Sequence, residues 1–188
     1  MEDLLRHLRL KSEVTTDLEE AIRSTFKTEH IQKKVVFEKA QQVCRKLYFI
    51  STGCLRTYYY AKGDKQVSSW FYTEKQFVTS WSSFYGNQVS FEYLETLEEC
   101  ELYSIDVTDF QNLIRKHPTF ERFARLLVEE QMVFLDTYFK GYMFLSAKER
   151  YELLLSYFPA IELRVGLGQI ASFLGISIET LSRIRSKK

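Results

Sequence analysis

The sequence contains few of the residues that break regular structure. Of its 188 residues only 7 are glycine and 2 are proline, which excludes a collagen-like, linker-rich or low-complexity chain. Hydrophobic residues make up 45% of the chain and aromatic residues 15%, so there is enough apolar surface for a substantial core. A chain of this length has room for one large domain, or for one medium and one small domain.

Cysteine and histidine are also scarce. Cys44, Cys54 and Cys100 are widely spaced, no C-x-x-C motif occurs, and none of the 3 histidines lies at ligand spacing from a cysteine. This pattern argues against a zinc motif or a disulfide framework. We therefore expect free thiols in a reducing cytoplasm and neither a metal nor another cofactor. No histidine accompanies a serine or cysteine in a recognisable nucleophile arrangement, so we do not expect an enzyme.

Long apolar runs are absent too. No segment approaches the roughly 18 apolar residues that a membrane span requires. The N-terminal segment MEDLLRHLRLKSE is charged throughout, unlike a secretory signal peptide. The sequence therefore predicts a soluble, cytoplasmic protein with no membrane partner.

Charge is nearly balanced, at +1 for the whole chain. From Ser146 to the C-terminus there are seven Lys and Arg against four Asp and Glu, a net charge of +3, which leaves −2 on the remainder. A weakly acidic body with a basic C-terminal region indicates where an anionic partner would bind.

The residue pattern changes twice along the chain. Apolar residues recur at helical spacing from Glu2 to about Phe26. From His30 to Ile105 the chain consists of short runs rich in Val, Ile, Phe, Tyr and Thr, with turn signals between them. Many short strands at close spacing predict an antiparallel barrel or sandwich. After Ile105 the helical period returns, with Asp106 or Thr108 placed to cap a helix that runs to Lys116.

A long helix is predicted from Pro118 to Leu145, because proline is favoured in a first helical turn and no further proline interrupts the pattern. At 1.5 Å per residue it would span roughly 40 Å. An apolar stripe runs along it, formed by Phe120, Phe123, Leu127, Phe134 and Tyr138. We interpret the stripe as a dimer interface, because two-fold pairing is the commonest way to cover such a surface. The alternative is that the helix packs along its own domain.

The C-terminal region begins with a capping box formed by Ser146 and Glu149, and Pro159 ends the helix that follows. Two short helical segments then flank Gly175. The spacing of Ala171, Gly175, Leu181 and Ile184 is that of a helix-turn-helix. Ser177 is a favourable N-cap for the second helix.

The outer face of that second helix has the composition of a DNA-reading surface. Its exposed positions are predicted to be Ile178, Glu179, Ser182, Arg183 and Arg185. Arginine can donate two hydrogen bonds to guanine, and glutamate can accept one from cytosine. Ser177 and Thr180 are placed to hold phosphates at the helix N-terminus, and Lys187 and Lys188 to add further positive charge. The alternative, an ordinary helical hairpin, accounts for the apolar spacing but not for this outer face.

These segments together resemble the cyclic-AMP receptor protein (Crp/Fnr) family of bacterial transcription regulators. LGISIETLSRIR (Leu174–Arg185) is similar to the family's recognition segment, and LYFISTGCLRTYYY (Leu47–Tyr60) to a hairpin of its β-roll. The resemblance implies an α+β fold with an antiparallel β-roll like a cyclic-nucleotide-binding domain, a double-stranded β-helix, over residues 1–117. A dimerisation helix over 118–145 and a helix-turn-helix domain over 146–188 would follow. The implied partners are double-stranded DNA, a second copy of the chain and RNA polymerase.

Three departures from the family pattern bear on specificity. The segment that holds the cyclic phosphate in the family corresponds to Gln76–Glu92, which contains no Lys, Arg or His. A buried phosphate would lack charge-assisted bonds there, which argues against cyclic AMP. Ile178 stands where the receptor protein has a base-reading arginine, so a different DNA sequence is expected. The family pattern also continues into a wing beyond the position of Lys188.

The effector therefore remains unidentified. The residues that we expect around an effector pocket are Arg56, Trp70, Ser80, Trp81, Ser82, Ser83 and Ser90. They would line a site for a less charged ligand, or pack the interior of a ligand-free β-roll. Five glutamates between Glu92 and Glu101 are interpreted as the solvated edge of a strand pair.

Two functions are consistent with these observations. The first is a transcription regulator that binds palindromic operators as a dimer under the control of a β-roll effector domain. The alternative is a β-roll ligand-binding or interaction protein with no DNA-binding role, whose C-terminal helices serve only in packing.

Overall fold

The computed structural model describes residues 1–186. Its helices are α1 (Glu2–Arg9), α2 (Thr16–Thr25), α3 (Trp81–Gly86), α4 (Val107–Lys116), α5 (Pro118–Phe144), α6 (Ala147–Tyr157), α7 (Ile161–Arg164), α8 (Leu167–Leu174) and α9 (Ile178–Arg185). Its strands are β1 (Lys27–Ile31), β2 (Val36–Glu38), β3 (Lys46–Thr52), β4 (Leu55–Ala61), β5 (Lys65–Tyr72), β6 (Phe77–Val78), β7 (Tyr93–Thr96) and β8 (Cys100–Asp106).

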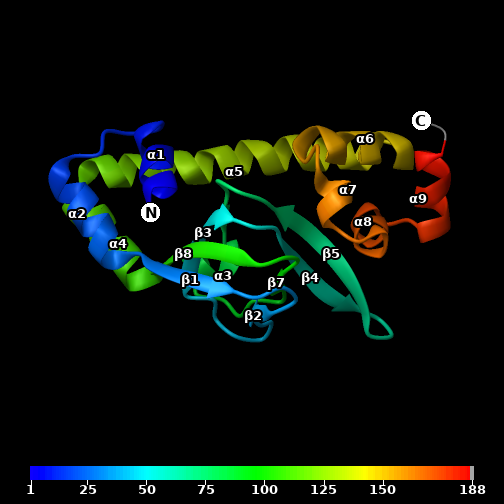
Figure 1. Cartoon of the computed structure of the whole chain (residues 1–188), viewed down its shortest axis with the longest axis horizontal. Helices are drawn as coiled ribbons and strands as arrows, with labels where there is room; N and C mark the ends of the chain where they lie inside the picture. Colours follow the sequence, from blue (N-terminus) through cyan, green and yellow to red (C-terminus); the bar gives the residue numbers. More distant parts are fainter. Residues whose placement is uncertain (187–188) are drawn as a thin grey trace.

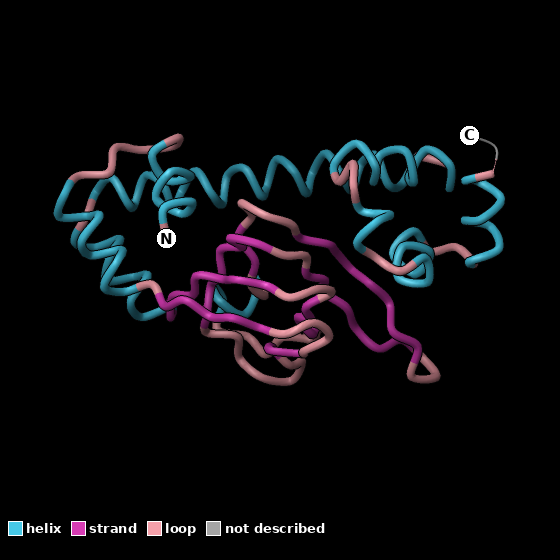
Figure 2. The backbone as a smooth tube through the Cα atoms, viewed as in Figure 1, coloured by secondary structure: helices cyan, strands magenta, loops and turns pink. Residues whose placement is uncertain are grey.

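The strands form two four-stranded antiparallel sheets, in the orders β1-β8-β3-β6 and β2-β7-β4-β5. A buried apolar cluster that includes Ile50, Leu55, Leu94 and Leu102 draws on strands of both sheets. Figure 2 shows the strands gathered beside the middle of α5, with helices at both ends of the molecule. The expected antiparallel β-roll is therefore confirmed.

The N-terminal region, which was predicted to be helical from Glu2 to about Phe26, consists of two helices within that range. α1 ends at Arg9, and Thr15 begins α2 by accepting a hydrogen bond from the amide of Leu18 at 3.3 Å. A threonine in an extended conformation satisfies an otherwise unpaired amide at a new helix start. The predicted caps at Asp106 and Ser146 are both present.

The long helix α5 follows the long axis of the molecule (Figure 1). Its first half is buried in its own domain: Phe120, Phe123 and Leu127 are at most 3% exposed and pack with α1, α2 and α4. The predicted stripe is therefore largely an intramolecular face, and for these residues the dimer interpretation was wrong. Helical periodicity identifies an apolar face but not the surface that covers it. Neither α5 nor another helix among residues 1–186 is long and apolar enough to cross a membrane.

All three cysteines are buried and unpaired. Burial raises the pKa of the Cys54 thiol to about 12 and that of Cys100 to about 11. Both therefore remain protonated and unreactive at neutral pH, as expected of thiols that serve as small apolar side chains.

The C-terminal helices pack on the β-roll through a second apolar cluster. Phe71 of β5 lies in this cluster with Phe173 and Leu174 of α8 and with Leu154 of α6. Trp70, also on β5, is partly buried and packs against this cluster. Its ring centroid lies 4.7 Å from that of Tyr138 on α5 and 5.4 Å from that of Phe173.

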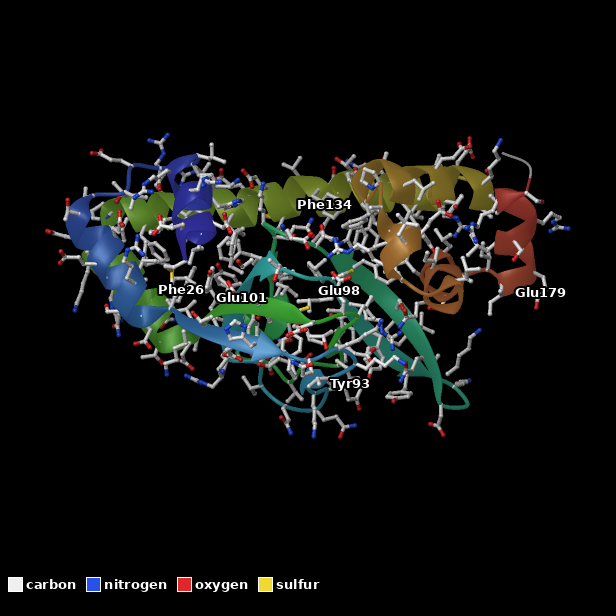
Figure 3. All side chains as sticks on the ribbon, viewed as in Figure 1. Phe26, Tyr93, Glu98, Glu101, Phe134 and Glu179 are labelled. Atoms are coloured by element: carbon white, nitrogen blue, oxygen red, sulfur yellow. The ribbon has the colours of Figure 1, made fainter. Side chains whose placement is uncertain are left out.

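An ion-pair cluster holds α7 to the β-roll. The Arg164 guanidinium donates two hydrogen bonds to the Glu74 carboxylate, at 2.7 and 2.9 Å, and also binds Glu98, which is labelled in Figure 3. Hydrogen bonds from Arg164 hold the pKa of Glu74 at about 2, below its ordinary value of 4.5. Bidentate pairing of this kind is geometrically specific, so it fixes the position of α7.

Truncation of Leu127 to alanine is expected to lower the free energy of unfolding by about 2–5 kcal/mol, because it leaves a cavity in the core. Leu10, which is 80% exposed, provides the matched control, and Leu10→Ala should change the same quantity by less than about 0.5 kcal/mol. Urea denaturation of both variants measures the difference. Equal destabilisation would contradict the burial of the first half of α5.

Glu74 should make stability depend on pH in the acid range. Its pKa is depressed in the folded state, so its contribution is present above pH 4.5 and is lost as pH falls toward 2. We expect Glu74→Gln to be less stable than the parent above pH 5, with a difference that shrinks on acidification. Denaturant unfolding between pH 6 and 2.5 tests this. Glu20→Gln, at an exposed site on α2, is the control and should show no such convergence.

Candidate nucleic-acid interface and ligand cavity

The last two helices, α8 and α9, are joined by a tight turn at Gly175. This residue has φ of 66°, in the left-handed region that favours glycine. The Ile176 amide donates to the Ala171 carbonyl at 3.0 Å, and the Gly175 amide to the Ser172 carbonyl at 3.2 Å. This pair of bonds is a Schellman motif, which ends α8 and turns the chain toward α9.

α9 has one buried and one exposed face, as the sequence predicts. Leu181 is fully buried, and Ile184 is packed against the same apolar cluster. The exposed residues are Ile178, Glu179, Ser182, Arg183 and Arg185, while Ser177 is exposed at the helix start and Thr180 is half-buried. In Figure 3, Glu179 lies on α9 at the extreme end of the molecule, away from the strands. The structure thus brings these predicted residues together on one surface.

The start of α9 is polar and well ordered by its cap. The Ser177 hydroxyl accepts a hydrogen bond from the Thr180 amide at 3.2 Å. A hydrogen bond from Ser177 also holds the pKa of Glu179 below its ordinary value, so that this side chain is an anion at neutral pH. The amides of the first turn give the helix start a partial positive charge.

The two described arginines of α9 differ in their surroundings. Arg185 forms an ion pair with Glu162 of α7 at 2.8 Å, and Glu162 also accepts a hydrogen bond from Tyr151. Arg183 is exposed and forms no ion pair with any residue between 1 and 186. Its guanidinium is therefore available to an external anion. Lys187 and Lys188 lie outside the described residues.

A cavity of about 490 Å³ lies where β4, β5, α3, α5 and α8 meet. The β-roll contributes Thr57, Ser69, Trp70 and Tyr72, and α3 contributes Trp81. Phe134 and Tyr138 come from α5, and Ser172 and Phe173 from α8. Figure 1 shows α8 beside β5, at the same end of the molecule as α9. The cavity therefore connects the β-roll with the helix that precedes α9.

Of the predicted pocket residues, Trp70 and Trp81 line this cavity, and Arg56 does not. Arg56 is only 4% exposed, and its Nε donates to the Glu95 carboxylate on the neighbouring strand at 2.6 Å. Its other donors reach Ser68 and Gln66. Because the guanidinium is already paired, it is not free to bind a phosphate.

The four predicted serines lie outside the lining of this cavity. Ser80 occupies the N-cap position of α3 without a side-chain cap bond, and Ser82 is exposed. The Ser83 hydroxyl accepts a bond from the Cys44 amide at 2.7 Å, and the Ser90 hydroxyl bonds the backbone of Glu92. Ser83 and Ser90 thus hold local backbone.

Sequence reasoning missed Glu92 as a cavity residue. It was grouped with the glutamates of a solvated strand edge, yet it is half-buried and accepts a hydrogen bond from Ser69. Burial raises the pKa of its carboxyl, and the Ser69 bond partly opposes that rise. Glu95 and Glu98 of the same run pair with Arg56 and Arg164. Only the long-range contacts distinguish these glutamates from exposed ones such as Glu99.

The fold and part of the sequence correspond to known proteins. Residues 29–117 match the family model of the cyclic nucleotide-binding domain. A search of curated protein sequences finds no significant match to the chain.

Among solved structures, the c-di-GMP-responsive global regulator CLP from Xanthomonas campestris is 18% identical, with a TM-score of 0.70 over 92% of this chain and 91% of that one. FixK2 from Bradyrhizobium japonicum is 14% identical, with a TM-score of 0.73 over 86% of this chain and 83% of its own. A protein from Eubacterium rectale assigned to the Crp/Fnr regulators is 18% identical, with a TM-score of 0.69 over 90% and 81%. At these identities the likeness shows the fold alone: a cyclic-nucleotide-binding β-roll with a long helix.

Proposed function

We propose that this chain is a DNA-binding transcription regulator of the Crp/Fnr type, which binds palindromic operators as a homodimer under the control of its β-roll. α8 and α9 would form the helix-turn-helix, and α9 would enter the major groove. The likeness of fold to regulators supports this proposal.

One observation carries the proposal: the exposed face of α9 carries an arginine that no described acidic residue holds, although Arg185 on the same face pairs with Glu162. Leu181 faces the interior, whereas Arg183 is exposed and forms no ion pair with any residue between 1 and 186. An arginine side chain that is free on the exposed face of a helix can donate hydrogen bonds to guanine O6 and N7. Ser177 and the first-turn amides would hold a phosphate.

The second half of α5 offers a surface for the second copy. Met132, Leu135, Phe139 and Met143 are exposed by 41–78% and recur at intervals of three and four residues. This spacing is that of a coiled-coil seam. The interface would thus lie on a different side of α5 from the stripe predicted by sequence, and would set the separation of the two α9 helices.

The side chains in the expected phosphate-binding segment do not favour cyclic AMP as the effector, although residues 29–117 match the cyclic nucleotide-binding domain. The segment Gln76–Glu92 has no cationic side chain, and Arg56 is paired with Glu95. A cyclic phosphate would therefore lose its hydration without gaining a charged partner.

The alternative function, a ligand-binding protein that does not bind DNA, is favoured by one observation. α8 is packed on β5, where the Ser172 hydroxyl accepts from the Ser68 amide at 3.2 Å, as expected if the C-terminal helices only close the β-roll. Selection of bound sites from random duplex DNA decides between the two functions. A regulator should enrich two half-sites about 34 Å apart, and failure to enrich any sequence would favour the alternative.

Arg183→Ala is expected to weaken binding to the selected site by about 1–3 kcal/mol and to relax the preference at one base pair in each half-site. Fluorescence anisotropy with a panel of single-base variants measures both effects. Arg115→Ala, at an exposed site on α4, removes the same charge far from α9 and should change neither. A uniform loss across the panel would mean that Arg183 contributes only general electrostatic attraction.

The Met132→Glu, Met143→Glu double variant should convert the dimer to a monomer, because it places like charges in an apolar two-fold interface. Sedimentation velocity at micromolar concentration distinguishes the two states. Thr137→Glu introduces charge on another side of α5, five residues from Met132 and two from Phe139, and should leave the dimer intact. A monomeric parent protein, or dimers of all three proteins, would exclude this interface.

A further inference from the structure

The cavity beside Trp70 has a charge pattern opposite to the one that a phosphate requires. Its volume of about 490 Å³ falls within the roughly 300–1,000 Å³ of small-molecule sites. Among the described residues that line it, Glu92 is the one charged side chain, and none is Lys, Arg or His. The site is thus suited to a ligand of opposite charge to a nucleotide.

Glu92 lacks the positive partner that neighbouring glutamates have. Glu95 and Glu98 pair with Arg56 and Arg164, whereas Glu92 forms no ion pair with any residue between 1 and 186. Its partner is the hydroxyl of Ser69, which donates to one carboxylate oxygen and lies 2.9 Å from the Thr57 hydroxyl. Burial raises the pKa of this carboxyl, and a nearby cation would reverse that effect.

Aromatic rings form most of the remaining wall. The aromatic side chains of the lining include Tyr72, Trp81 and Trp70, and Phe134 and Tyr138 of α5. Burial raises the pKa of the Tyr72 hydroxyl, and the charge of the Glu92 carboxylate adds to that rise. The faces of such rings attract cations within about 6 Å, an effect that strengthens when water is excluded.

We propose that this cavity binds an organic cation, with an ammonium group held at Glu92 and an aromatic or apolar body between Trp70, Trp81 and α5. The ammonium group would pair with the carboxylate and donate hydrogen bonds to it. The body would bury apolar surface against the rings. An anionic ligand of the same shape would instead place a like charge beside Glu92.

A regulatory consequence follows if the proposed DNA-binding function is correct, and it rests on that function. Ser172, Phe173 and Gly175 also line the cavity, and Gly175 forms the turn that leads into α9. A bound cation would therefore touch both the β-roll and the helices that carry the DNA-reading face. If the β-roll and the C-terminal helices can adopt two relative arrangements, a ligand that binds one arrangement more tightly shifts the population toward it.

Isothermal titration calorimetry of the full chain with three indole probes tests the binding site. Tryptamine carries an ammonium group, tryptophol a neutral hydroxyl and indole-3-acetate a carboxylate, on similar bodies. We expect tryptamine to bind about tenfold or more tightly than tryptophol, and indole-3-acetate to bind most weakly. Preference for indole-3-acetate, equal affinities, or binding of none of the three would overturn the proposal.

Glu92→Gln provides the decisive variant, because it removes the charge while keeping the size of the side chain. It should reduce tryptamine affinity to that of tryptophol and leave tryptophol affinity unchanged. Glu99→Gln, at an exposed site in the β7–β8 turn, is the matched control and should bind tryptamine like the parent. Trp81→Leu should weaken tryptamine and tryptophol together. Tryptamine binding that is unchanged in Glu92→Gln would place the cation elsewhere.

The outcome is independent of DNA binding. Cation binding in a protein that enriches no operator would refute the proposed function and leave the cavity assignment standing. Operator binding in a protein that binds no cation would do the reverse. If both hold, a tryptamine concentration that saturates the parent but not Glu92→Gln should change operator affinity in the parent and leave that of the variant nearly unchanged.

Discussion

The ring of Trp70 is the contact that joins the β-roll to both the long helix and the C-terminal helices. It packs against Phe134 and Tyr138 of α5, with centroids 5.0 and 4.7 Å away, and against Phe173 of α8. Aromatic pairs of this geometry each contribute roughly 0.5–1.5 kcal/mol beyond the apolar area that they bury. Because one side chain joins β5, α5 and α8, none of the three can move without disturbing the others. This junction keeps α8 on the β-roll and leaves the outer face of α9 exposed.

The parts of the fold that could be predicted from sequence are those set by neighbours in the chain. The caps at Asp106, Ser146 and Ser177 and the turn at Gly175 depend on a few adjacent residues, and the structure contains each of them. The long helix was predicted to within one residue of its end for the same reason. What covers Leu127 could not be predicted, because the helical period is the same whether the apolar face meets its own domain or a second copy.

The candidate site was also predictable only where it depends on neighbouring residues in the chain. The prediction of the pocket residues failed because these depend on long-range contacts. The exposed residues of α9 follow from one helix and its cap, and were placed correctly on one surface. The pocket residues depend on strands that are distant in sequence. Arg56 and Glu95 meet across β4 and β7, while Glu98 meets Arg164 from α7. In the sequence these glutamates are indistinguishable from Glu92. Among residues 1–186, Glu95 and Glu98 meet arginines from distant segments, whereas Glu92 does not.

The match of residues 29–117 to the cyclic nucleotide-binding domain therefore describes the scaffold and leaves the ligand open. The same β-roll can hold ligands of either charge, because binding is decided by the few side chains that face the cavity. Here the described part of the wall contains one carboxylate and several rings, and the candidate cation Arg56 is held by Glu95. The cavity also shares Phe173 with the junction at Trp70. A ligand that changed the packing of this ring would act directly on α8, so the proposed recognition in the β-roll would be linked to α9 through a single layer of side chains.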